Sequence, residues 1–587
     1  MKRRLVDMDP ESVHQRREAL EGQFAPWTAR TTAQLFDLAA ARHPDRYFVL
    51  TDERCFTYRE MQQWSCRLAA GLLATGVRQG DHIAVDMANY PEFIALKLAI
   101  ARVGAVSVAI NFLLRHEELK YILEQSQATM LITMDRFRNL DYLDSLDRVA
   151  PGWEQNGGGS VLPHLRHVFV FPVSQPADSP TRGAPLSCLA AAGANITDAQ
   201  ILSETSSVQA HLVSDILYTS GTTGRPKGVM LTHDGVVRTA YSSALTRAFQ
   251  DGRRIGYAMP MYHVFGYVEA MIAVLFVGGA IVPQTVFDPA TMLSAVARHE
   301  IDELICVPTM TSRLLEEATE NDYDLSHLTT MFSSGTAHPP QMWQQILATL
   351  KVSEVVTAYG QTETTASATC TLPGDPLERY QFTNGTIKPA GAAGDPELGG
   401  AMAIYKVVAT DTGQDLPNGE IGELMAKGPS ITPGYFDKPE ETAALFTEDG
   451  WMHTGDLGRI DDRGYLVLTG RIKESYRCGG ELVLPSEVES VLGRHPTVKA
   501  AHIIGLPHDR MGEVGCAFVV AADSAEPSEG ELIAYCTSLL ARFKVPAHVI
   551  VIPESELPVT VTGRVQKFQL TERATAELAR RVETAVL

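Results

Sequence analysis

An alternation of helices with short apolar strands constrains the fold of this chain more than any other feature. "PEFIALKLAIARVG" (91–104) places its apolar residues on one face of a helix. The apolar runs "AVSVAI" (105–110) and "MLIT" (130–133) then predict buried strands. The pattern holds from 31 to 150 and again from 211 to about 370. Helices between strands imply layered, mostly parallel sheets, so the predicted fold class is α/β.

Changes in this pattern predict the domain organisation. Residues 150–200 contain "QNGGGS" and "SQPADSPTRGAP", which predict a loop-rich insertion. Short strands between Gly, Pro and Asp turns predict a small β-barrel or sheet subdomain at about 380–468. A compact α+β unit follows Gly470. We therefore expect a large N-terminal domain (1–470), which includes the β-rich subdomain, and a small C-terminal domain (471–587).

Two helix starts are expected in the C-terminal domain. Ser486 with Glu489, and Ser528 with Glu531, have the spacing of a capping box. In that motif each side chain satisfies a backbone donor that the first helical turn leaves without a partner.

The composition limits the classes of partner. The net charge of -20 argues against a nucleic-acid-binding surface and against unaided docking on anionic membranes. The eight cysteines show no metal-like spacing, which is typical of reduced thiols. The charged start of the chain lacks the apolar core of a secretory signal, and no apolar run is long enough to span a membrane. These features predict a cytoplasmic protein without a membrane span.

The stretch "YTSGTTGRPKGVMLTH" (218–233) predicts a phosphate-binding loop. Its glycines allow close backbone approach and a nest of N–H groups, and its hydroxyl and cationic side chains add donors and charge. It is not a Walker A loop, because Gly228 rather than Ser or Thr follows Lys227.

The whole sixteen-residue string resembles the phosphate loop of the adenylate-forming superfamily, which includes acyl-CoA synthetases, adenylation domains and luciferases. Further segments resemble that superfamily's motifs in the same order along nearly the whole chain. They are "PMYHVFG" (260–266), "SSGTAHP" (333–339), "AYGQTE" (358–363), "WMHTGDLG" (451–458) and "GRIKESYRCGGELVLPSEVE" (470–489). In this superfamily the N-terminal domain binds the acyl-adenylate, and the C-terminal domain is a mobile lid.

The resemblance implies a reaction in two halves. A carboxylate attacks the α-phosphate of ATP, which gives an acyl-adenylate and pyrophosphate. A thiol, usually that of CoA, then attacks the acyl carbon and expels AMP. The first half joins two anions, so it depends on charge neutralisation and positioning.

The resemblance also implies roles for individual residues. Glu363 would supply a carboxylate for Mg²⁺, a cation that prefers oxygen ligands. His263 would gate the acyl pocket or guide the thiol, and Lys473 would be the hinge of the lid. The implied nucleotide contacts are Thr219, Ser220, Gly221, Thr222, Thr223, Gly224 and Lys227 for the phosphates, Gly335, Thr336, Ala337 and Tyr359 for adenine, Thr362 for the α-phosphate, and Asp456 and Arg471 for the ribose. Gly479 and Gly480 would line the passage for CoA, or would simply form a tight turn.

One position departs from the superfamily pattern. Its late lid motif reads P-x-T-x-[ST]-G-K, whereas residues 558–564 read "PVTVTGR", so Arg564 replaces the catalytic lysine. A planar, forked guanidinium does not reproduce a compact ammonium. Losing one preorganised donor to developing charge typically costs about 10²–10³-fold in rate. Lys567 could substitute, but from a different direction.

This departure leaves several functions open. The first is an acyl-CoA ligase that accepts a preformed acyl-adenylate of a hydrophobic carboxylic acid and adenylates weakly or not at all. It resembles the non-adenylating ligases of bacterial terpenoid-antibiotic pathways, in which a separate enzyme supplies the adenylate. The alternatives are a complete ATP-dependent acyl-CoA synthetase for a fatty or aryl acid, an acyl-AMP ligase that loads a carrier protein, luciferase-like oxidation, and a catalytically dead nucleotide-binding protein.

Overall fold

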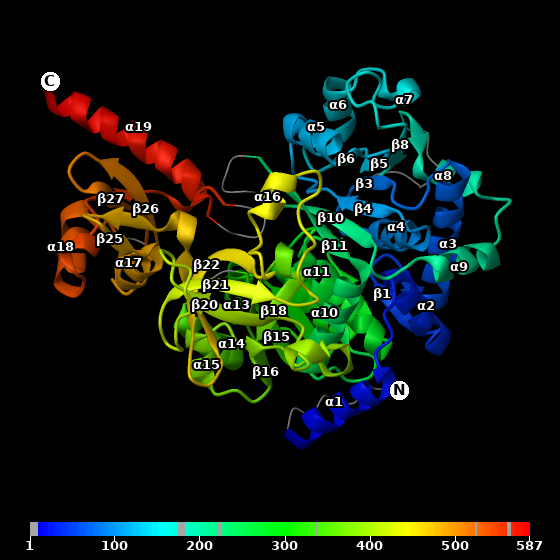
Figure 1. Cartoon of the computed structure of the whole chain (residues 1–587), viewed down its shortest axis with the longest axis horizontal. Helices are drawn as coiled ribbons and strands as arrows, with labels where there is room; N and C mark the ends of the chain where they lie inside the picture. The colour runs from blue at the N-terminus through cyan, green and yellow to red at the C-terminus, as the bar shows by residue number, and fades with distance from the viewer. Residues whose placement is uncertain are drawn as a thin grey trace. The chain divides into compact units, whose positions relative to one another are not determined.

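The computed structural model describes residues 10–173, 182–219, 225–335, 339–522, 525–559 and 565–586. The chain divides into two compact units, which we describe separately (Figure 1). The large unit comprises Met1–Ile404 and Ala426–Met452, and the small unit comprises Tyr405–Met425 and His453–Leu587. The predicted domain boundary at residue 471 stays a prediction. None of the described helices is long and apolar enough to cross a membrane.

The large unit contains two seven-stranded sheets. The first has the order β11-β10-β4-β3-β5-β8-β9, and all its strands are parallel except β11, which pairs antiparallel with β10. Its strands are β3 (His82–Asp86), β4 (Val106–Ala109), β5 (Met130–Met134), β8 (His167–Phe171), β9 (Ala184–Pro185), β10 (Val213–Thr219) and β11 (Lys227–Thr232).

The second sheet has the order β16-β15-β14-β12-β13-β1-β2, and it is parallel except for β2. Its strands are β1 (Tyr47–Leu50), β2 (Cys55–Thr57), β12 (Arg254–Tyr257), β13 (Ala280–Pro283), β14 (Glu303–Cys306), β15 (Thr330–Ser333) and β16 (Glu354–Val356). A three-stranded sheet of β17 (Ala358–Gln361), β18 (Ala366–Cys370) and β19 (Thr386–Ile387) follows it, and a short hairpin joins β6 (Arg136–Phe137) to β7 (Leu140–Asp141).

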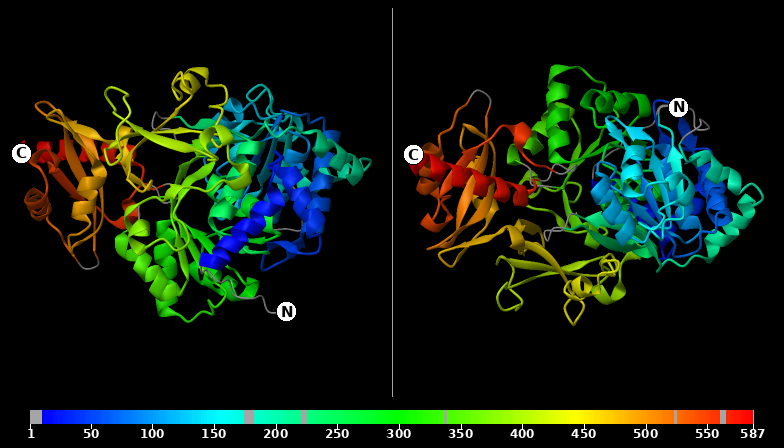
Figure 2. Two further views of the ribbon diagram at one scale, coloured as in Figure 1. Left: turned by 60° about the horizontal axis from the view of Figure 1, so that its bottom comes forward. Right: turned by 90° about the horizontal axis from the view of Figure 1, so that it is seen from above.

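Helices lie against both seven-stranded sheets (Figures 1 and 2). Those of the large unit are α1 (Pro10–Phe24), α2 (Thr32–Arg42), α3 (Tyr58–Ala74), α4 (Pro91–Arg102), α5 (His116–Gln125), α6 (Tyr142–Val149), α7 (Trp153–Asn156), α8 (Leu186–Ala192), α9 (Asp198–Ser207), α10 (His233–Thr246), α11 (Val264–Gly266), α12 (Pro289–His299), α13 (Pro308–Glu320), α14 (Pro340–Leu350), α15 (Leu377–Phe382) and α16 (Pro439–Ala443). A π-helix, η1 (Tyr267–Ile272), follows α11 directly.

The predicted α/β class is confirmed, and α4, β4 and β5 lie where the apolar pattern predicts them. The prediction of a loop-rich insertion at 150–200 is wrong where that segment forms α7, β8, β9, α8 and the start of α9. β8 is a buried strand of the first sheet, and α8 and α9 pack on α3. The neighbouring glycines and prolines obscured these elements, because each is too short for its periodicity to be evident.

Among its described residues, the small unit has two sheets and three α-helices. Its four-stranded sheet has the order β20-β21-β22-β23, with β20 (Ile404–Val408), β21 (Gly422–Lys427), β22 (Met452–Ile460) and β23 (Leu466–Arg471). Its five-stranded sheet contains β24 (Tyr476–Cys478), β25 (Glu481–Val483), β26 (Val498–His508), β27 (Gly512–Ala521) and β28 (His548–Val551). The helices are α17 (Pro485–Leu492), α18 (Glu529–Leu539) and α19 (Lys567–Val586).

Of the two predicted helix caps, the one at Ser528 forms and the one at Ser486 does not. Ser528 caps α18 and accepts a hydrogen bond from the backbone N–H of Glu531 at 3.2 Å. The Ser486–Glu489 capping box is wrong, because Leu484 is the cap of α17 and Ser486 already lies in its first turn. The Ser486 hydroxyl instead donates to the carbonyl of Thr469.

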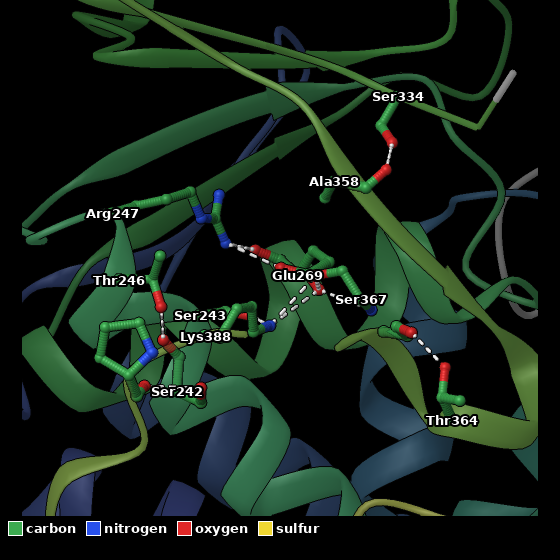
Figure 3. A network of polar contacts seen from close by, with 12 residues as sticks. Ser242, Ser243, Thr246, Arg247, Glu269, Ser334, Ala358, Thr364, Ser367 and Lys388 are labelled. Atoms are coloured by element: carbon green, nitrogen blue, oxygen red, sulfur yellow. Dashed lines mark hydrogen bonds and ion pairs between the residues drawn. The ribbon is translucent and has the colours of Figure 1, made fainter. Parts of the chain in front are cut away.

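A buried network of charges joins η1 to the surrounding elements of the large unit. The carboxylate of Glu269, on η1, accepts from Arg247 Nη2 at 3.2 Å and lies 3.5 Å from Lys388 Nζ (Figure 3). It also accepts from the backbone N–H and the hydroxyl of Ser367, on β18. Arg247 also pairs with Glu303 of β14. Burial alone would raise the pKa of Glu269, but Lys388 and Arg247 together hold it below its ordinary value.

We predict that Glu269→Gln lowers the free energy of unfolding of the large unit by about 3–5 kcal/mol. Removing one partner of a buried ionic network leaves the opposing charges uncompensated. Urea denaturation would measure the change, with Glu320→Gln, at the exposed end of α13, as the control. An unchanged denaturation midpoint for Glu269→Gln would contradict this account of the network.

Candidate active site

The predicted site residues of the large unit follow the carboxyl ends of parallel strands. The predicted phosphate loop follows β10, the segment 260–266 follows β12, and Gly335 follows β15. In open α/β sheets, this edge is where ligands bind. Thr219 and Lys227 form the last cross-strand pair of the β10–β11 hairpin, so the hairpin holds both ends of the loop together. The predicted site residues Ser220, Gly221, Thr222, Thr223, Gly224, Thr336, Ala337 and Arg564 lie outside the described residues.

Tyr435 brings Lys227 and Glu363 together. Its hydroxyl donates to Glu363 Oε1 at 3.0 Å, and Lys227 Nζ lies 4.9 Å from the centre of its ring. Burial, followed by the charge of Glu363, raises the pKa of Tyr435, so the phenol remains a hydrogen-bond donor. One aromatic side chain therefore contacts a predicted phosphate ligand through its ring and a predicted Mg²⁺ ligand through its hydroxyl.

Backbone hydrogen bonds also connect the segment around Tyr435 to the turn that carries Glu363 and to β11, which carries Lys227. The N–H of Thr432 donates to the carbonyl of Glu363 at 2.8 Å, and that of Phe436 donates to the carbonyl of Gly228 at 2.8 Å. Sequence reasoning missed Tyr435. Its only local signal is an aromatic residue directly after "TPG", and nothing in that pattern indicates a contact with Glu363, 72 positions earlier.

Two backbone features mark the segment after Glu363. Thr365 and Ala366 have φ values of 59° and 109°, which non-glycine residues rarely adopt. The hydroxyl of Thr365 donates to the carbonyl of Ser430 at 2.6 Å, and this contact helps to hold the turn. Such strain persists only where the surroundings enforce it, and it concentrates at functional sites.

The predicted adenine contacts Gly335 and Tyr359 are held next to each other. The hydroxyl of Ser334 donates to the carbonyl of Ala358 at 2.6 Å, which joins the end of β15 to β17 (Figure 3). Gly335 has a φ of 107°, a conformation that favours glycine. Tyr359 is only 6% exposed, so most of its ring packs within the protein. Thr362 is also buried, in the turn that carries Glu363.

His263 lies in a tight aromatic segment beside β15. Its ring centre is 5.3 Å from that of Tyr262, and the ring of Phe265 packs edge-on against Phe332 of β15 at 5.0 Å. Burial lowers the pKa of His263 to about 4, so its imidazole is neutral at pH 7. A neutral imidazole can accept a hydrogen bond from a thiol or gate a pocket, but it brings no positive charge.

The small unit holds the other predicted residues. Arg471 Nε lies 2.9 Å from Asp456 Oδ1, across the β22–β23 pair. Lys473 lies in the short helical turn Ile472–Glu474, directly after β23. Gly479 and Gly480 have φ values of 64° and 90° and form the two-residue turn between β24 and β25. This turn itself favours glycine. Contact of these glycines with CoA stays a prediction.

The donor set around Glu363 fits Mg²⁺. No group of three or more potential metal-ligating side chains gathers anywhere in the part of the chain that the structure describes. Mg²⁺ does not need such a group, because it commonly binds one or two carboxylates, substrate phosphates and waters. The single carboxylate of Glu363, held by a neutral donor, satisfies this requirement.

Comparison with known proteins identifies the family. The profile of the family "AMP-binding enzyme" matches residues 36–436, and that of the "AMP-binding enzyme C-terminal domain" matches residues 487–564. A Mycobacterium tuberculosis 3-[(3aS,4S,7aS)-7a-methyl-1,5-dioxo-octahydro-1H-inden-4-yl]propanoyl:CoA ligase is 34% identical, over 92% of this chain and 99% of that protein. The Escherichia coli medium-chain fatty-acid–CoA ligase is 30% identical, over 95% of this chain and 93% of that protein.

The fold agrees with this relationship. The crystal structure of ATP-bound MatB from Rhodopseudomonas palustris has a TM-score of 0.79 and 28% identity, and it covers 92% of this chain and 98% of that chain. The chain therefore belongs to the AMP-binding, adenylate-forming enzymes. Within them it lies in the acyl-CoA ligase branch, and it is an enzyme of the AMP-forming acid–thiol ligase class.

We predict that two substitutions separate the contacts of Tyr435. Tyr435→Phe removes the hydrogen bond to Glu363 but keeps the ring beside Lys227, whereas Tyr435→Leu removes both. In calorimetric titrations with ATP, Tyr435→Phe should weaken binding about 10-fold with Mg²⁺ and leave it unchanged in EDTA. A hydrogen bond to a charged group typically contributes about 1.5–3 kcal/mol. Tyr435→Leu should weaken binding under both conditions.

The control for this pair is Tyr323→Phe, because Tyr323 donates to Glu317 away from the site. Wild-type ATP binding by Tyr435→Phe, with and without Mg²⁺, would show that the Tyr435 hydroxyl does not orient Glu363 for the metal.

Proposed function

We propose that this enzyme forms an acyl-CoA from the acyl-adenylate of a hydrophobic carboxylic acid and CoA, and that its own ATP-dependent adenylation is weak. The observation that carries the proposal of weak adenylation is Arg564, which stands where the family's lid motif has lysine. Adenylation must hold two anionic oxygens at attack distance, where a misplacement of about 1 Å can cost roughly 10²-fold. A larger, forked cation at this position is expected to disturb that geometry.

The contacts of Lys567 support weak adenylation. Its ammonium donates to Glu489 Oε1 at 2.7 Å and lies 3.6 Å from Glu474 Oε2. The side chain is only 17% exposed, so both carboxylates share a charge that is largely withdrawn from solvent. A lysine held in this way would have to break a half-buried ion pair before it could replace the missing lid lysine.

The thioester half of the reaction makes different demands. The CoA sulphur attacks the acyl carbonyl, the bond to the AMP oxygen breaks, and the thiol proton passes to solvent or a nearby base. We propose that neutral His263 guides the thiol, that Asp456 and Arg471 hold the ribose, and that Gly479 and Gly480 line the path of CoA. None of these steps requires a lysine at position 564.

The remaining site residues serve the nucleotide in this proposal. Thr219, Lys227 and the loop between them would bind phosphate, with adenine beside Gly335 and Tyr359 and the α-phosphate beside Thr362. Glu363 would hold Mg²⁺, which neutralises phosphate charge when it is bound. Residues 471–587 would act as the mobile lid with Lys473 as its hinge, closing on the acyl-adenylate-binding domain.

The relatives support a hydrophobic acid as the acyl donor. Their names specify a bicyclic propanoate in one case and medium-chain fatty acids in the other. We propose that a separate enzyme supplies the acyl-adenylate in the cytoplasm. This is the arrangement in the natural-product pathways whose non-adenylating ligases this enzyme resembles.

A complete ATP-dependent acyl-CoA synthetase is the second candidate. It is favoured by the many relatives that are named as acyl-CoA ligases and by the structural neighbour that was solved with ATP. In this case Arg564 would fulfil the role of the lysine.

Two assays decide between these candidates. Carboxylate-dependent ATP–pyrophosphate exchange reports adenylation, and acyl-CoA formation from synthetic octanoyl-AMP and CoA reports thioester formation. We predict that the wild-type enzyme forms the thioester, and that Arg564→Lys raises exchange by about 10²–10³-fold. The matched control is Arg580→Lys, at an exposed position on α19.

Each outcome has a distinct meaning. Strong exchange in the wild type would establish the complete synthetase. Failure to form a thioester from acyl-AMP and CoA would exclude both candidates. If Arg564→Lys leaves weak exchange unchanged, the deficit lies elsewhere in the chain.

A further inference from the structure

The turn that carries His263 is tied to the opposite sheet by Asn89. Asn89 follows β3 of the first sheet, whereas the turn Met259–His263 follows β12 of the second sheet. Asn89 Nδ2 donates to the carbonyl of Met259 at 3.0 Å and to the carbonyl of Gln284 at 3.1 Å. Its Oδ1 accepts from the N–H of Met261 at 2.9 Å.

These bonds use both amide hydrogens of Asn89 and one acceptor site of its oxygen. All three partners are backbone groups, at the ends of two neighbouring parallel strands, β12 and β13. Asn89 is 4% exposed, and its bonds to Met259 and Met261 are buried, so these two bonds lie in a region of low dielectric and would be costly to leave unmade. Asn89 therefore fixes the position of the main chain two residues before His263.

The turn transmits this position to His263. The N–H of His263 donates to the carbonyl of Pro260 at 3.0 Å, which closes the turn. Gly266 packs so closely on it that a Cβ atom there would lie 2.7 Å from the carbonyl oxygen of Met259. The far side of the segment is fixed by Glu269 and its network on η1. His263 thus lies between two anchored points.

Asn89 itself lies between the turn and a cleft of the large unit. Asn89 and Gln284 line a cleft of about 1260 Å³, together with the ends of β1 and β13 and with residues of α3. None of the described site residues predicted from the sequence lines this cleft. Met259 and Met261 lie in the hydrophobic core and do not line this cleft, so the hydrogen bonds of Asn89 connect the buried turn to the wall of the cleft.

We propose that Asn89 is a positioning residue for the thioester-forming step, which it serves by holding His263 at the acyl carbonyl. The inference rests on the proposed role of His263 in that step. Asn89 itself does not contact the reacting atoms. It selects one position of the turn, and a displacement of about 1 Å at a reacting group can cost roughly 10²-fold in rate.

A double-mutant cycle tests this coupling. Asn89→Ala should lower kcat for thioester formation from octanoyl-AMP and CoA by roughly 10²-fold. The octanoyl-AMP affinity should stay close to that of the wild type, whereas the thermal midpoint should fall because buried backbone groups lose their partner, with the protein still folded at the assay temperature. Asn89→Asp should have the same effect, because it keeps the acceptor for Met261 but loses both donors. The double variant Asn89→Ala/His263→Ala should be no slower than His263→Ala, because residues that act as a unit are not additive.

The control is Asn321→Ala, whose amide donates to Glu317 on the surface of α13. It should leave kcat unchanged. Additive losses in the double variant would overturn the proposal, and so would a loss of kcat that only follows a loss of folded protein.

A second measurement keeps the two proposals distinguishable. If the wild type forms no thioester, the proposed function fails, but the position of His263 can still be observed. The imidazole NMR signals of His263, assigned by their loss in His263→Gln, should shift in Asn89→Ala and Asn89→Asp and stay fixed in Asn321→Ala. Unmoved signals would overturn the positioning role regardless of activity.

Discussion

The geometry of the large unit around the candidate site depends on the ion pairs and hydrogen bonds of the Glu269 carboxylate. This carboxylate brings Arg247, Lys388 and Ser367 to one buried point on a π-helix that begins four residues after His263. Ser367 lies four residues after Glu363, so the same carboxylate constrains the two segments that carry these side chains. Buried charges are tolerated only when they are paired and hydrogen-bonded, which makes this arrangement discrete rather than adjustable.

The other contacts that define the candidate site also join separate elements. Tyr435 joins Lys227 of the β10–β11 hairpin to Glu363, and Asn89 joins β3 to the turn after β12. The strands provide a rigid edge, and a few polar side chains set the positions of the loops that leave it.

The small unit bears on which half-reaction this enzyme performs. In the proposed function, the pairing of Lys567 with Glu489 is the physical reason why Lys567 does not replace the lid lysine. The Asp456–Arg471 pair and the glycine turn at 479–480 are both formed, and the proposed function assigns them to the ribose and to the path of CoA. A complete synthetase would need these two features as well, so they agree with both proposed functions.

The sequence by itself determined the α/β class, the strands β4 and β5 and the family motifs, because each depends on local periodicity or on a short run of residues. It did not reveal Tyr435, Asn89 or Glu269, and it assigned Ser486 to a capping box that does not form. Asn89 meets Met259 and Met261 only because two sheets meet there, although 170 and 172 positions separate them in the chain. A single sequence carries no local signal for such a contact, so the tertiary structure alone decided which polar side chains position the site.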